Sequence, residues 1–262
     1  MATSYVVVGA SRGIGLEYVR QLAGRPDTIV FAIVRNAKGS THLAAAVAHL
    51  KNVHVVEADI VDHASLERAA KEVAAVTGGR LDCLIHNAAR MGGDTVFSGF
   101  DHYPSMDALD ADFIEAFKIN ALGVVHSVAA FLPLLRAAPT KKIVVISTHG
   151  AVPAVVYSAE ITNMCAYGTT KAAGALATAK WALQLKGEGF TVVSLTPGLV
   201  DTTDTIGPTG DPELKEMLRK IAEGTTAFVL ETPEQSVRAQ LQVIDRLTPA
   251  DNGAFLDHHG AQ

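Results

Sequence analysis

The chain has 262 residues, of which 48% are hydrophobic, and it carries a net charge of -5 with a pI near 6.0. This length allows one large α/β domain with a sizeable core, and no long run of Pro, Gly and Ser interrupts it, so we expect a single domain over residues 1–262. The acidic balance offers no basic field for nucleic acid or an anionic membrane, so a small-molecule partner is favoured.

The N-terminus and the cysteines bear on where the protein works. Residues 1–10 lack a positively charged start and lead directly into a strand-like segment, which is not the pattern of a signal peptide. The longest weakly polar stretch, 121–135, is too short to span a bilayer. Cys83 and Cys165 have neither a disulfide framework nor metal-ligand spacing, so we expect reduced thiols in a cytoplasmic protein.

Short strand-like runs alternate with longer helix-compatible segments along the chain. The runs are almost continuously apolar, as expected of strands that helices cover on both faces. The alternation predicts an α/β Rossmann fold, a doubly wound parallel sheet of about seven strands whose ligands bind at the carboxyl ends of the strands. The predicted strands are 5–8, 28–34, 53–57, 81–86, 142–147, 190–195 and 254–257, and the predicted helices are 13–24, 38–50, 64–77, 110–137, 166–187 and 233–247.

A glycine-rich turn, GASRGIG, joins the first strand to the first helix. It begins at Gly9 and places Gly13 and Gly15 where a helix opens near Ile14. Glycine there lets the backbone turn sharply and approach a pyrophosphate, whose charge faces the positive end of the helix. Because strand, turn, helix and second strand follow in the required order, we predict a dinucleotide site here in preference to a simple tight turn.

The end of the second strand indicates which nicotinamide cofactor fits. An acidic residue at that place accepts hydrogen bonds from the ribose 2′-hydroxyl and repels a 2′-phosphate. This strand instead runs into Arg35 and Asn36, and Arg12 in the glycine turn is a second cation. A guanidinium suits a phosphate, so NADP(H) is the predicted cofactor; the alternative is that both arginines are only solvated.

Tyr167 and Lys171 lie one helical turn apart in the segment YGTTK. A phenol with a pKa of about 10 is poorly matched to proton transfer at neutral pH, and a neighbouring ammonium would stabilise its phenolate. The spacing by itself also fits a half-buried aromatic beside a solvated charge.

Taken together, seven segments resemble the short-chain dehydrogenase/reductase superfamily over essentially the whole chain. The C-terminal half, with TPEQSVRAQLQVIDRL and GAFLDHHG, is most similar to the branch of carbonyl reductases, bacterial C-factor-like proteins and fungal polyketide ketoreductases of the norsolorinic acid ketoreductase type. The matching segments are GASRGIG at 9–15, EADIVD at 57–62, HNAA at 86–89, KINALG at 118–123, VVIST at 144–148, YGTTK at 167–171 and TPGLVDT at 196–202.

The resemblance implies a cofactor site along the carboxyl edge of the sheet. It places Asp59 and Ile60 beside the adenine ring, although Asp59 also fits a plain turn residue, and it places 197–202 around the nicotinamide carboxamide and the pyrophosphate. The cofactor-binding residues that it implies are Gly9, Ser11, Arg12, Gly13, Ile14, Gly15, Arg35, Asp59, Ile60, Asn87, Ala88, Ala89, Tyr167, Lys171, Pro197, Gly198, Val200 and Thr202.

The resemblance also implies a catalytic group of four. Tyr167 is the general acid that protonates a carbonyl oxygen as hydride arrives, and Lys171 stabilises the phenolate and holds the nicotinamide ribose. Asn120 supports a water in a proton relay, with a polar residue at a helix kink as the alternative. Thr148 takes the position of the family's serine by strand register, with Ser147 as the fallback.

Two further segments are expected to shape the substrate pocket. An insertion before the tyrosine, AVPAVVYSAEITNMCA, offers an apolar lining at 152–156 and holds Tyr157, which lacks a lysine four residues on and is not a catalyst. Residues 201–232 interrupt the alternation with turn residues and a short charged helix at 213–222, and we predict a lid there. We expect no metal, because the six histidines considered as ligands, of ten in the chain, show no metal geometry; they are His42, His49, His54, His102, His258 and His259.

The function expected from these features is that of an NADPH-dependent ketoreductase in secondary metabolism. Its substrate would be a medium-sized, cyclic or aromatic ketone or aldehyde, polyketide-type compounds included. The alternatives are a family member with other chemistry, such as dehydration or epimerisation, and a cofactor-binding regulator without turnover. A homo-oligomer, dimer or tetramer, is expected, with a monomer left open.

Overall fold

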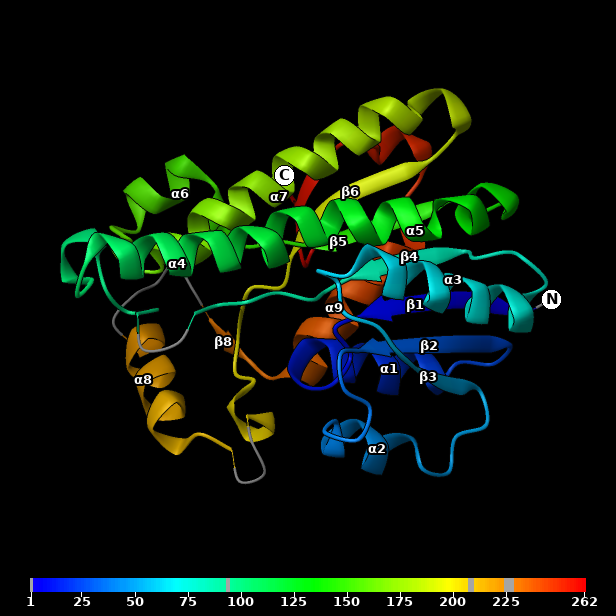
Figure 1. The fold of residues 1–262 in the computed structure, drawn as a ribbon, viewed down its shortest axis with the longest axis horizontal. Helices are drawn as coiled ribbons and strands as arrows, with labels where there is room; N and C mark the ends of the chain where they lie inside the picture. The colour runs from blue at the N-terminus through cyan, green and yellow to red at the C-terminus, as the bar shows by residue number, and fades with distance from the viewer. Residues whose placement is uncertain (1, 93–94, 207–209, 224–228) are drawn as a thin grey trace.

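A seven-stranded parallel sheet forms the centre of the molecule (Figure 1). The structure is a computed structural model that describes residues 2–92, 95–206, 210–223 and 229–262. The strand order is β3-β2-β1-β4-β5-β6-β9, and all neighbouring strands run parallel. The strands are β1 (Thr3–Val8), β2 (Thr28–Val34), β3 (Val53–Glu57), β4 (Cys83–His86), β5 (Lys142–Ile146), β6 (Thr191–Thr196) and β9 (Phe255–Asp257).

Strand order reverses between β1 and β4, which fixes where a ligand can bind. Strands β2 and β3 lie on one side of β1. The later strands lie on the other side, beginning with β4. The connections leave a crevice at the carboxyl ends of these two strands. Val8 pairs with His86, so the glycine turn at Gly9 and the segment from Asn87 open into the same crevice.

Helices cover both faces of the sheet, as the continuously apolar strands predict. Alternate residues of β1 point to opposite faces, so Val6 and Val8 join one core while Val7 joins the other. The first core includes residues of α3 (His63–Thr77), α5 (Gly123–Ala137) and α7 (Cys165–Leu185). The second includes residues of α1 (Gly13–Ala23), α2 (Thr41–Val47) and α9 (Pro233–Arg246). This arrangement confirms the predicted doubly wound fold.

One long helical stretch is more elaborate than the predicted helix at 110–137. It consists of α4 (Met106–Phe117), a π-helical turn (Lys118–Leu122) and α5, without a break. By length and composition, the 32-residue stretch Met106–Ala137 could cross a membrane, because the helical stretch extends well beyond the apolar run at 121–135. However, 56% of its most apolar window is buried inside the protein, which is typical of a core helix.

Two segments add structure that the strand and helix pattern did not predict. The insertion before the tyrosine contains a short helix, α6 (Pro153–Ser158), and β7 (Leu199–Val200) pairs with β8 (Leu230–Glu231) in a separate two-stranded sheet. The predicted charged helix is present as α8 (Pro212–Glu223). The predicted lid spans 201–232, of which 207–209 and 224–228 lie outside the described residues, so the lid stays a prediction.

Candidate active site and cofactor site

The four predicted catalytic side chains come from three elements that meet beyond the carboxyl end of β5. Tyr167 and Lys171 lie in the first turns of α7, Thr148 follows β5, and Asn120 lies in the π-helical turn. Gly168 permits a close approach, because a Cβ there would lie 2.9 Å from the Gly150 carbonyl oxygen. The loop after β5 therefore packs directly on the tyrosine helix.

Of the two candidate hydroxyl residues after β5, Thr148 and not Ser147 contacts the Tyr167 phenol. Its hydroxyl forms a hydrogen bond with the Tyr167 phenol, and it accepts a hydrogen bond from the Gly150 N–H at 3.2 Å. Burial raises the pKa of Tyr167 to about 12, while the Thr148 hydrogen bond acts in the opposite direction. The phenol is therefore protonated at neutral pH and is placed to donate to an oxygen beside Thr148.

Lys171 is buried. The spacing in the sequence suggested that its ammonium faces the Tyr167 phenol, but the ammonium is directed elsewhere. Its Nζ donates a hydrogen bond to the Ile146 carbonyl oxygen at the end of β5. Burial lowers the pKa of Lys171 to about 8, and the side chain is only 4% exposed. Direct stabilisation of the phenolate by a contacting ammonium is therefore not seen here, because the lysine is directed to the strand backbone.

Asn120 is held rigidly within the π-helical turn. Its amide accepts from the Arg90 N–H at 2.8 Å and donates to the Arg90 carbonyl oxygen and the Thr170 hydroxyl, each at 2.9 Å. Single π turns inside α-helices occur frequently at functional sites. Across the helix interface, a Cβ at Gly174 would lie 2.5 Å from the Asn120 carbonyl oxygen. This turn thus presents the Asn120 backbone carbonyl toward α7 at Gly174.

An ionic network behind Asn120 was missed by the sequence analysis. Arg90 pairs with the buried Asp112 at 2.5 Å and with Glu115 at 3.0 Å. Asp112 also accepts from the Tyr103 hydroxyl at 2.7 Å and the Thr95 hydroxyl at 3.0 Å, and these donors help to hold the pKa of Asp112 below its usual range. The feature in the sequence that could have indicated this network is Arg90, which directly follows HNAA. Its carboxylate partners lie further along the chain on α4.

Ser147 and His86 are buried at the carboxyl ends of neighbouring strands, Ser147 just after β5 and His86 at the end of β4. Ser147 is 3% exposed, and its hydroxyl lacks a hydrogen-bond partner among the described residues, whereas its N–H donates to the Leu195 carbonyl oxygen at 2.7 Å. His86 is buried with its Nδ1 3.1 Å from the Ser127 hydroxyl, and burial together with the charge of Lys171 lowers its pKa to about 3. His86 is thus a packed neutral histidine.

The glycine turn has the close backbone approaches that a pyrophosphate site requires. Gly9 has φ of +82°, and a Cβ there would lie 2.6 Å from the Ala88 Cα; a Cβ at Gly15 would lie 2.1 Å from the Gly9 carbonyl oxygen. Helix α1 has no side-chain cap and no acidic residue in its first turn, so its N–H donors and positive dipole favour an anion. Ser11 and Ile14 are half-buried within the same turn.

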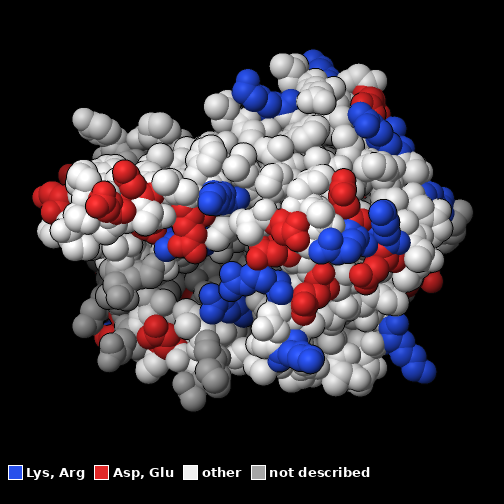
Figure 2. Space-filling model, viewed as in Figure 1, with Lys and Arg blue, Asp and Glu red and all other residues white. Residues whose placement is uncertain are grey.

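The region expected to bind a 2′-phosphate is basic and open. Arg12 and Arg35 are exposed, and Figure 2 shows basic side chains gathered where Figure 1 places the start of α1 and the loop toward α2. Glu57, at the end of the neighbouring β3, accepts from the Ala37 N–H at 2.9 Å, so its carboxylate fixes the loop that follows Arg35. The sequence does not show this role of Glu57, because the residue lies on another strand.

The predicted adenine and nicotinamide residues also lie on this edge. Ile60 is buried, and Asp59 Oδ1 accepts from the Val61 N–H at 3.1 Å, so Asp59 is at least a turn residue. Asn87 donates to the Gly9 carbonyl oxygen at 2.9 Å, which ties the HNAA segment to the glycine turn. In that segment, Ala88 is half-buried and Ala89 is exposed.

The loop after β6 closes on the glycine turn from the other side. The Pro197 carbonyl oxygen accepts from the Ser236 hydroxyl at 2.7 Å, and Gly198 has φ of +81°. Val200 lies in β7, and a Cβ at Gly13 would lie 3.1 Å from Thr202 Cγ2. The 197–202 loop and the glycine turn therefore form two sides of one site. The Gly13 N–H donates to the Thr205 hydroxyl at 2.9 Å, a bond that a phosphate oxygen could replace.

The insertion and the segment at 95–100 border the tyrosine. Met164 N–H donates to the Val96 carbonyl oxygen at 2.8 Å, and Cys165 Sγ lies 3.6 Å from the Ser98 carbonyl oxygen, which brings this segment to the start of α7. Tyr157 is 89% exposed, so it is a surface aromatic and not a catalyst. In the insertion, Val152, Val155 and Val156 are half-buried and Pro153 is exposed.

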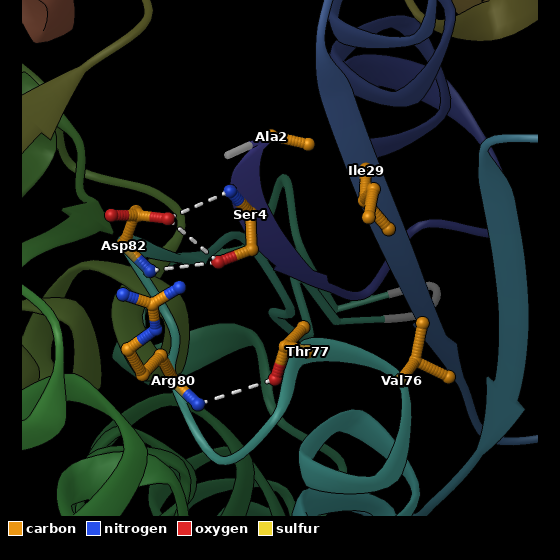
Figure 3. Close-up of a pocket in the computed structure, with 7 residues that line it drawn as sticks. All are labelled: Ala2, Ser4, Ile29, Val76, Thr77, Arg80 and Asp82. Atoms are coloured by element: carbon orange, nitrogen blue, oxygen red, sulfur yellow. Dashed lines mark hydrogen bonds between the residues drawn. The ribbon is translucent and has the colours of Figure 1, made fainter.

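A separate hollow of ≈ 180 Å³ lies at the opposite, amino end of the sheet and is not part of this site (Figure 3). Asp82 accepts from the Ser4 N–H and hydroxyl, both at 2.9 Å, and from the Thr140 hydroxyl at 2.9 Å. These bonds join the first residues of β1 to the residue before β4. The hollow is thus a structural junction.

Comparisons with known proteins agree with this geometry. The short chain dehydrogenase family model matches residues 4–212. The chain is 36% identical over 261 residues to short-chain dehydrogenase/reductase atnB of Arthrinium sp, with 98% of each chain covered. It is 37% identical to short-chain dehydrogenase/reductase AacuF of Aspergillus aculeatus, with 98% of this chain and 97% of that protein covered.

Among solved structures, the fold is similar to the NADPH-bound carbonyl reductase from chicken fatty liver. The TM-score is 0.79 at 27% identity, with 99% of this chain and 98% of that chain covered. The fold, the residues that meet at the carboxyl edge and these similarities lead to one conclusion. The chain belongs to the short-chain dehydrogenase family of oxidoreductases and lies near its carbonyl reductase branch.

Proposed function

We propose that this protein is an NADPH-dependent ketoreductase that reduces a medium-sized, cyclic or aromatic ketone or aldehyde, including polyketide-type compounds. The observation that carries the proposal is the hydrogen bond between Thr148 and the Tyr167 phenol, with the buried Lys171 one helical turn away. This arrangement offers two hydroxyl donors to one carbonyl oxygen.

The chemistry follows from the protonation states of these groups. With a pKa of about 12, Tyr167 retains its proton at neutral pH, so it can protonate the oxygen of a carbonyl that is being reduced. With a pKa of about 8, Lys171 is mostly an ammonium at pH 7, held by the Ile146 carbonyl oxygen one helical turn from the tyrosine. Thr148 orients the carbonyl through its hydroxyl. The bound cofactor supplies the hydride.

NADP(H) is supported as the cofactor by the residues that would hold it. The glycine turn and the uncapped start of α1 suit the pyrophosphate, and the exposed Arg12 and Arg35 suit a 2′-phosphate. The carbonyl reductase of similar fold is described as NADPH-bound, which supports the same choice here.

The size and polarity of the substrate are inferred from the walls near the tyrosine. Val152, Val155 and Val156 are half-buried in the insertion, and the segment at 95–100, which contacts the start of α7, carries the exposed Phe97 and Phe100. Apolar and aromatic walls with a few polar groups are typical of pockets for small apolar ligands. We also propose that the protein acts in the cytoplasm, in secondary metabolism.

The proposal is tested by titrating the purified protein with NADPH and NADH, in wild type and in Arg35→Asp. We expect NADPH to bind at least about tenfold more tightly than NADH, since a hydrogen-bonded charge pair contributes about 1.5–3 kcal/mol. Arg35→Asp should remove this preference, while Arg68→Asp, an equal charge change at an exposed position on α3, should keep it. Equal affinities in wild type would contradict the assignment of NADP(H).

A further inference from the structure

Three metal-ligating side chains meet beside the loop at Gly198. Glu231 is the last residue of β8, and His258 and His259 directly follow β9. Their ligand atoms all lie within 4.8 Å of one another. The sequence shows no metal-ligand spacing because the carboxylate lies far upstream of the two histidines, so only the fold brings these side chains together.

The contacts within this cluster are close but unsatisfied. His258 Nε2 lies 2.9 Å from Glu231 Oε2, yet Glu231 Oε2 and His258 Nδ1 both lack a hydrogen-bond partner among the described residues. His258 Nε2 and Glu231 Oε2 are therefore close to each other, but the angle between them does not suit a hydrogen bond. Buried polar atoms without partners are rare, and a bound ion is one way in which such atoms are satisfied.

The spacing and the ligand types suit a transition-metal ion. Two ligands at about 2.0 Å from a tetrahedral zinc ion are about 3.3 Å apart, so the observed pair must open by only a few tenths of an ångström. Two imidazoles and a carboxylate are a ligand set that binds zinc and similar ions, with a position left for water. The imidazole rings of His258 and His259 have their centroids 4.1 Å apart.

The backbone around the cluster is fixed before any ion binds. The Asp257 carboxylate accepts from the N–H groups of His259 and Ala261, at 2.8 and 2.9 Å, which forms a tight turn. Arg246 donates to the His259 carbonyl oxygen at 2.8 Å, and the Asp201 N–H donates to the Glu231 carbonyl oxygen at 2.9 Å. Hydrogen bonds that hold the ligand-bearing residues in place limit the entropy that is lost on metal binding.

The cluster is exposed to solvent at His259. This exposed histidine lines a solvent-open hollow of ≈ 330 Å³, together with Arg246, Asp251 and Gly260. On the inner side, the cluster packs against Gly198, where a Cβ would lie 2.8 Å from His258 Cε1 and 3.2 Å from Glu231 Oε2. The absence of a side chain at Gly198 leaves room for the imidazole and the carboxylate to meet.

We propose that Glu231, His258 and His259 bind a divalent first-row transition-metal ion, with Zn²⁺ as the reference ion. Bound there, the ion joins β8 to the turn after β9 directly beneath Gly198. If the proposed function holds, Gly198 contacts the nicotinamide end of the cofactor, so the metal would steady that side of the cofactor site. The metal site itself requires no cofactor.

The test is a Zn²⁺ titration of the untagged, metal-stripped protein in competition with a chromophoric chelator. We expect one Zn²⁺ per chain, with affinity reduced at least about tenfold by Glu231→Gln, His258→Ala or His259→Ala, since each removes one ligand. His102→Ala is the matched control, because His102 is an exposed histidine paired with Asp101, and it should bind Zn²⁺ like wild type. Stoichiometric binding that none of the three ligand variants weakens would overturn the site, as would no binding.

Thermal unfolding guards against a variant that fails to fold. Saturating Zn²⁺ should raise the Tm of wild type and of His102→Ala by several degrees through mass action, and it should leave Glu231→Gln unchanged. Glu231→Gln keeps the shape of the side chain, so its metal-free Tm should stay near that of wild type. An equal Zn²⁺-dependent rise in Glu231→Gln would also overturn the proposal. NADPH titration of the same metal-free samples reports separately on the proposed function.

Discussion

At the scale of single residues, Thr148 and Ser147 carry neighbouring hydroxyls with different surroundings. Thr148 bonds the Tyr167 phenol, whereas the Ser147 hydroxyl is buried. We expect Thr148→Val to lower kcat/KM for carbonyl reduction by about 10²-fold, the usual loss on removing one oxyanion donor. Thr148→Ser should stay within about threefold of wild type, and so should Ser147→Ala. Steady-state kinetics on all three variants decides this, and a larger loss in Ser147→Ala than in Thr148→Val would reverse the assignment.

Lys171 makes the stability of the ligand-free protein depend on pH. Its folded pKa of about 8 lies below its unfolded value of 10.5, so the folded state binds the proton less tightly. Below pH 8 this costs stability, by about 3 kcal/mol at most. Between pH 8 and 10.5 the unfolded chain holds a proton that the folded chain has lost, and the cost disappears as pH rises.

Lys171→Met should therefore be more stable than wild type at pH 7, by about 1–3 kcal/mol. The gain is reduced because the Ile146 carbonyl oxygen loses its donor. The difference should shrink steadily toward pH 10. Urea unfolding of both proteins at several pH values measures it, and a difference that does not change with pH would show that Lys171 is not the group responsible.

The residues of the site differed in how far the sequence could predict them. The YGTTK spacing identified Tyr167 and Lys171, because one helical turn brings their positions to one face. Spacing could not show where the ammonium points, and it is directed to the Ile146 carbonyl oxygen. Asp112 was missed because its role depends on Arg90, which only the folded chain brings beside it.

At the scale of elements, the π-helical turn and α7 depend on each other's shape. A Cβ at Gly174 would lie 2.5 Å from the Asn120 carbonyl oxygen, so Gly174→Ala must push the two helices apart. We expect a loss of about 1–3 kcal/mol in the free energy of unfolding, together with reduced kcat as Asn120 moves. Gly187→Ala is the control, because a Cβ there meets nothing within 4 Å. Urea unfolding that shows equal stability for the two variants would contradict this packing.

The regular elements followed from hydrophobic pattern, and the irregular ones did not. The strand-like runs predicted β2 and β3 with the observed bounds: β2 is buried, as expected of a strand with helices on both faces, whereas β3 lies at the sheet edge and is mostly half-buried or exposed. The π turn at Lys118–Leu122 adds a residue to a helical turn without changing the apolar pattern, so the sequence offered only Asn120, a polar residue that fits a helix kink, as a sign of it. The pairing of β7 with β8 joins two-residue strands that are too short to show a period.

At the scale of the whole molecule, apolar side chains on α4 and α7 remain exposed. Ile114, Phe117, Leu176 and Leu183 are exposed by 56, 44, 61 and 74%. Contiguous exposed apolar surface commonly marks a protein interface. We expect a homodimer by light scattering, and a monomer for the double variant Phe117→Glu and Leu176→Glu. Tyr157→Glu, at the exposed tyrosine of α6, should remain a dimer. A wild-type monomer at micromolar concentration would contradict this interface.

In the proposed reaction, Tyr167 protonates a carbonyl oxygen as hydride from NADPH reaches the carbonyl carbon. The most direct measurement uses NADPH deuterated at the transferred position, a panel of cyclic and aromatic ketones, and mass spectrometry and NMR of the products. Wild type should place one deuterium on the carbinol carbon of the product, whereas Tyr167→Phe should bind NADPH normally and form at least about 10²-fold less product. The proposed reaction would be contradicted by deuterium on a carbon beside the carbonyl or by a product without deuterium. It would also be contradicted by full turnover in Tyr167→Phe, or by NADPH binding with no turnover of any ketone.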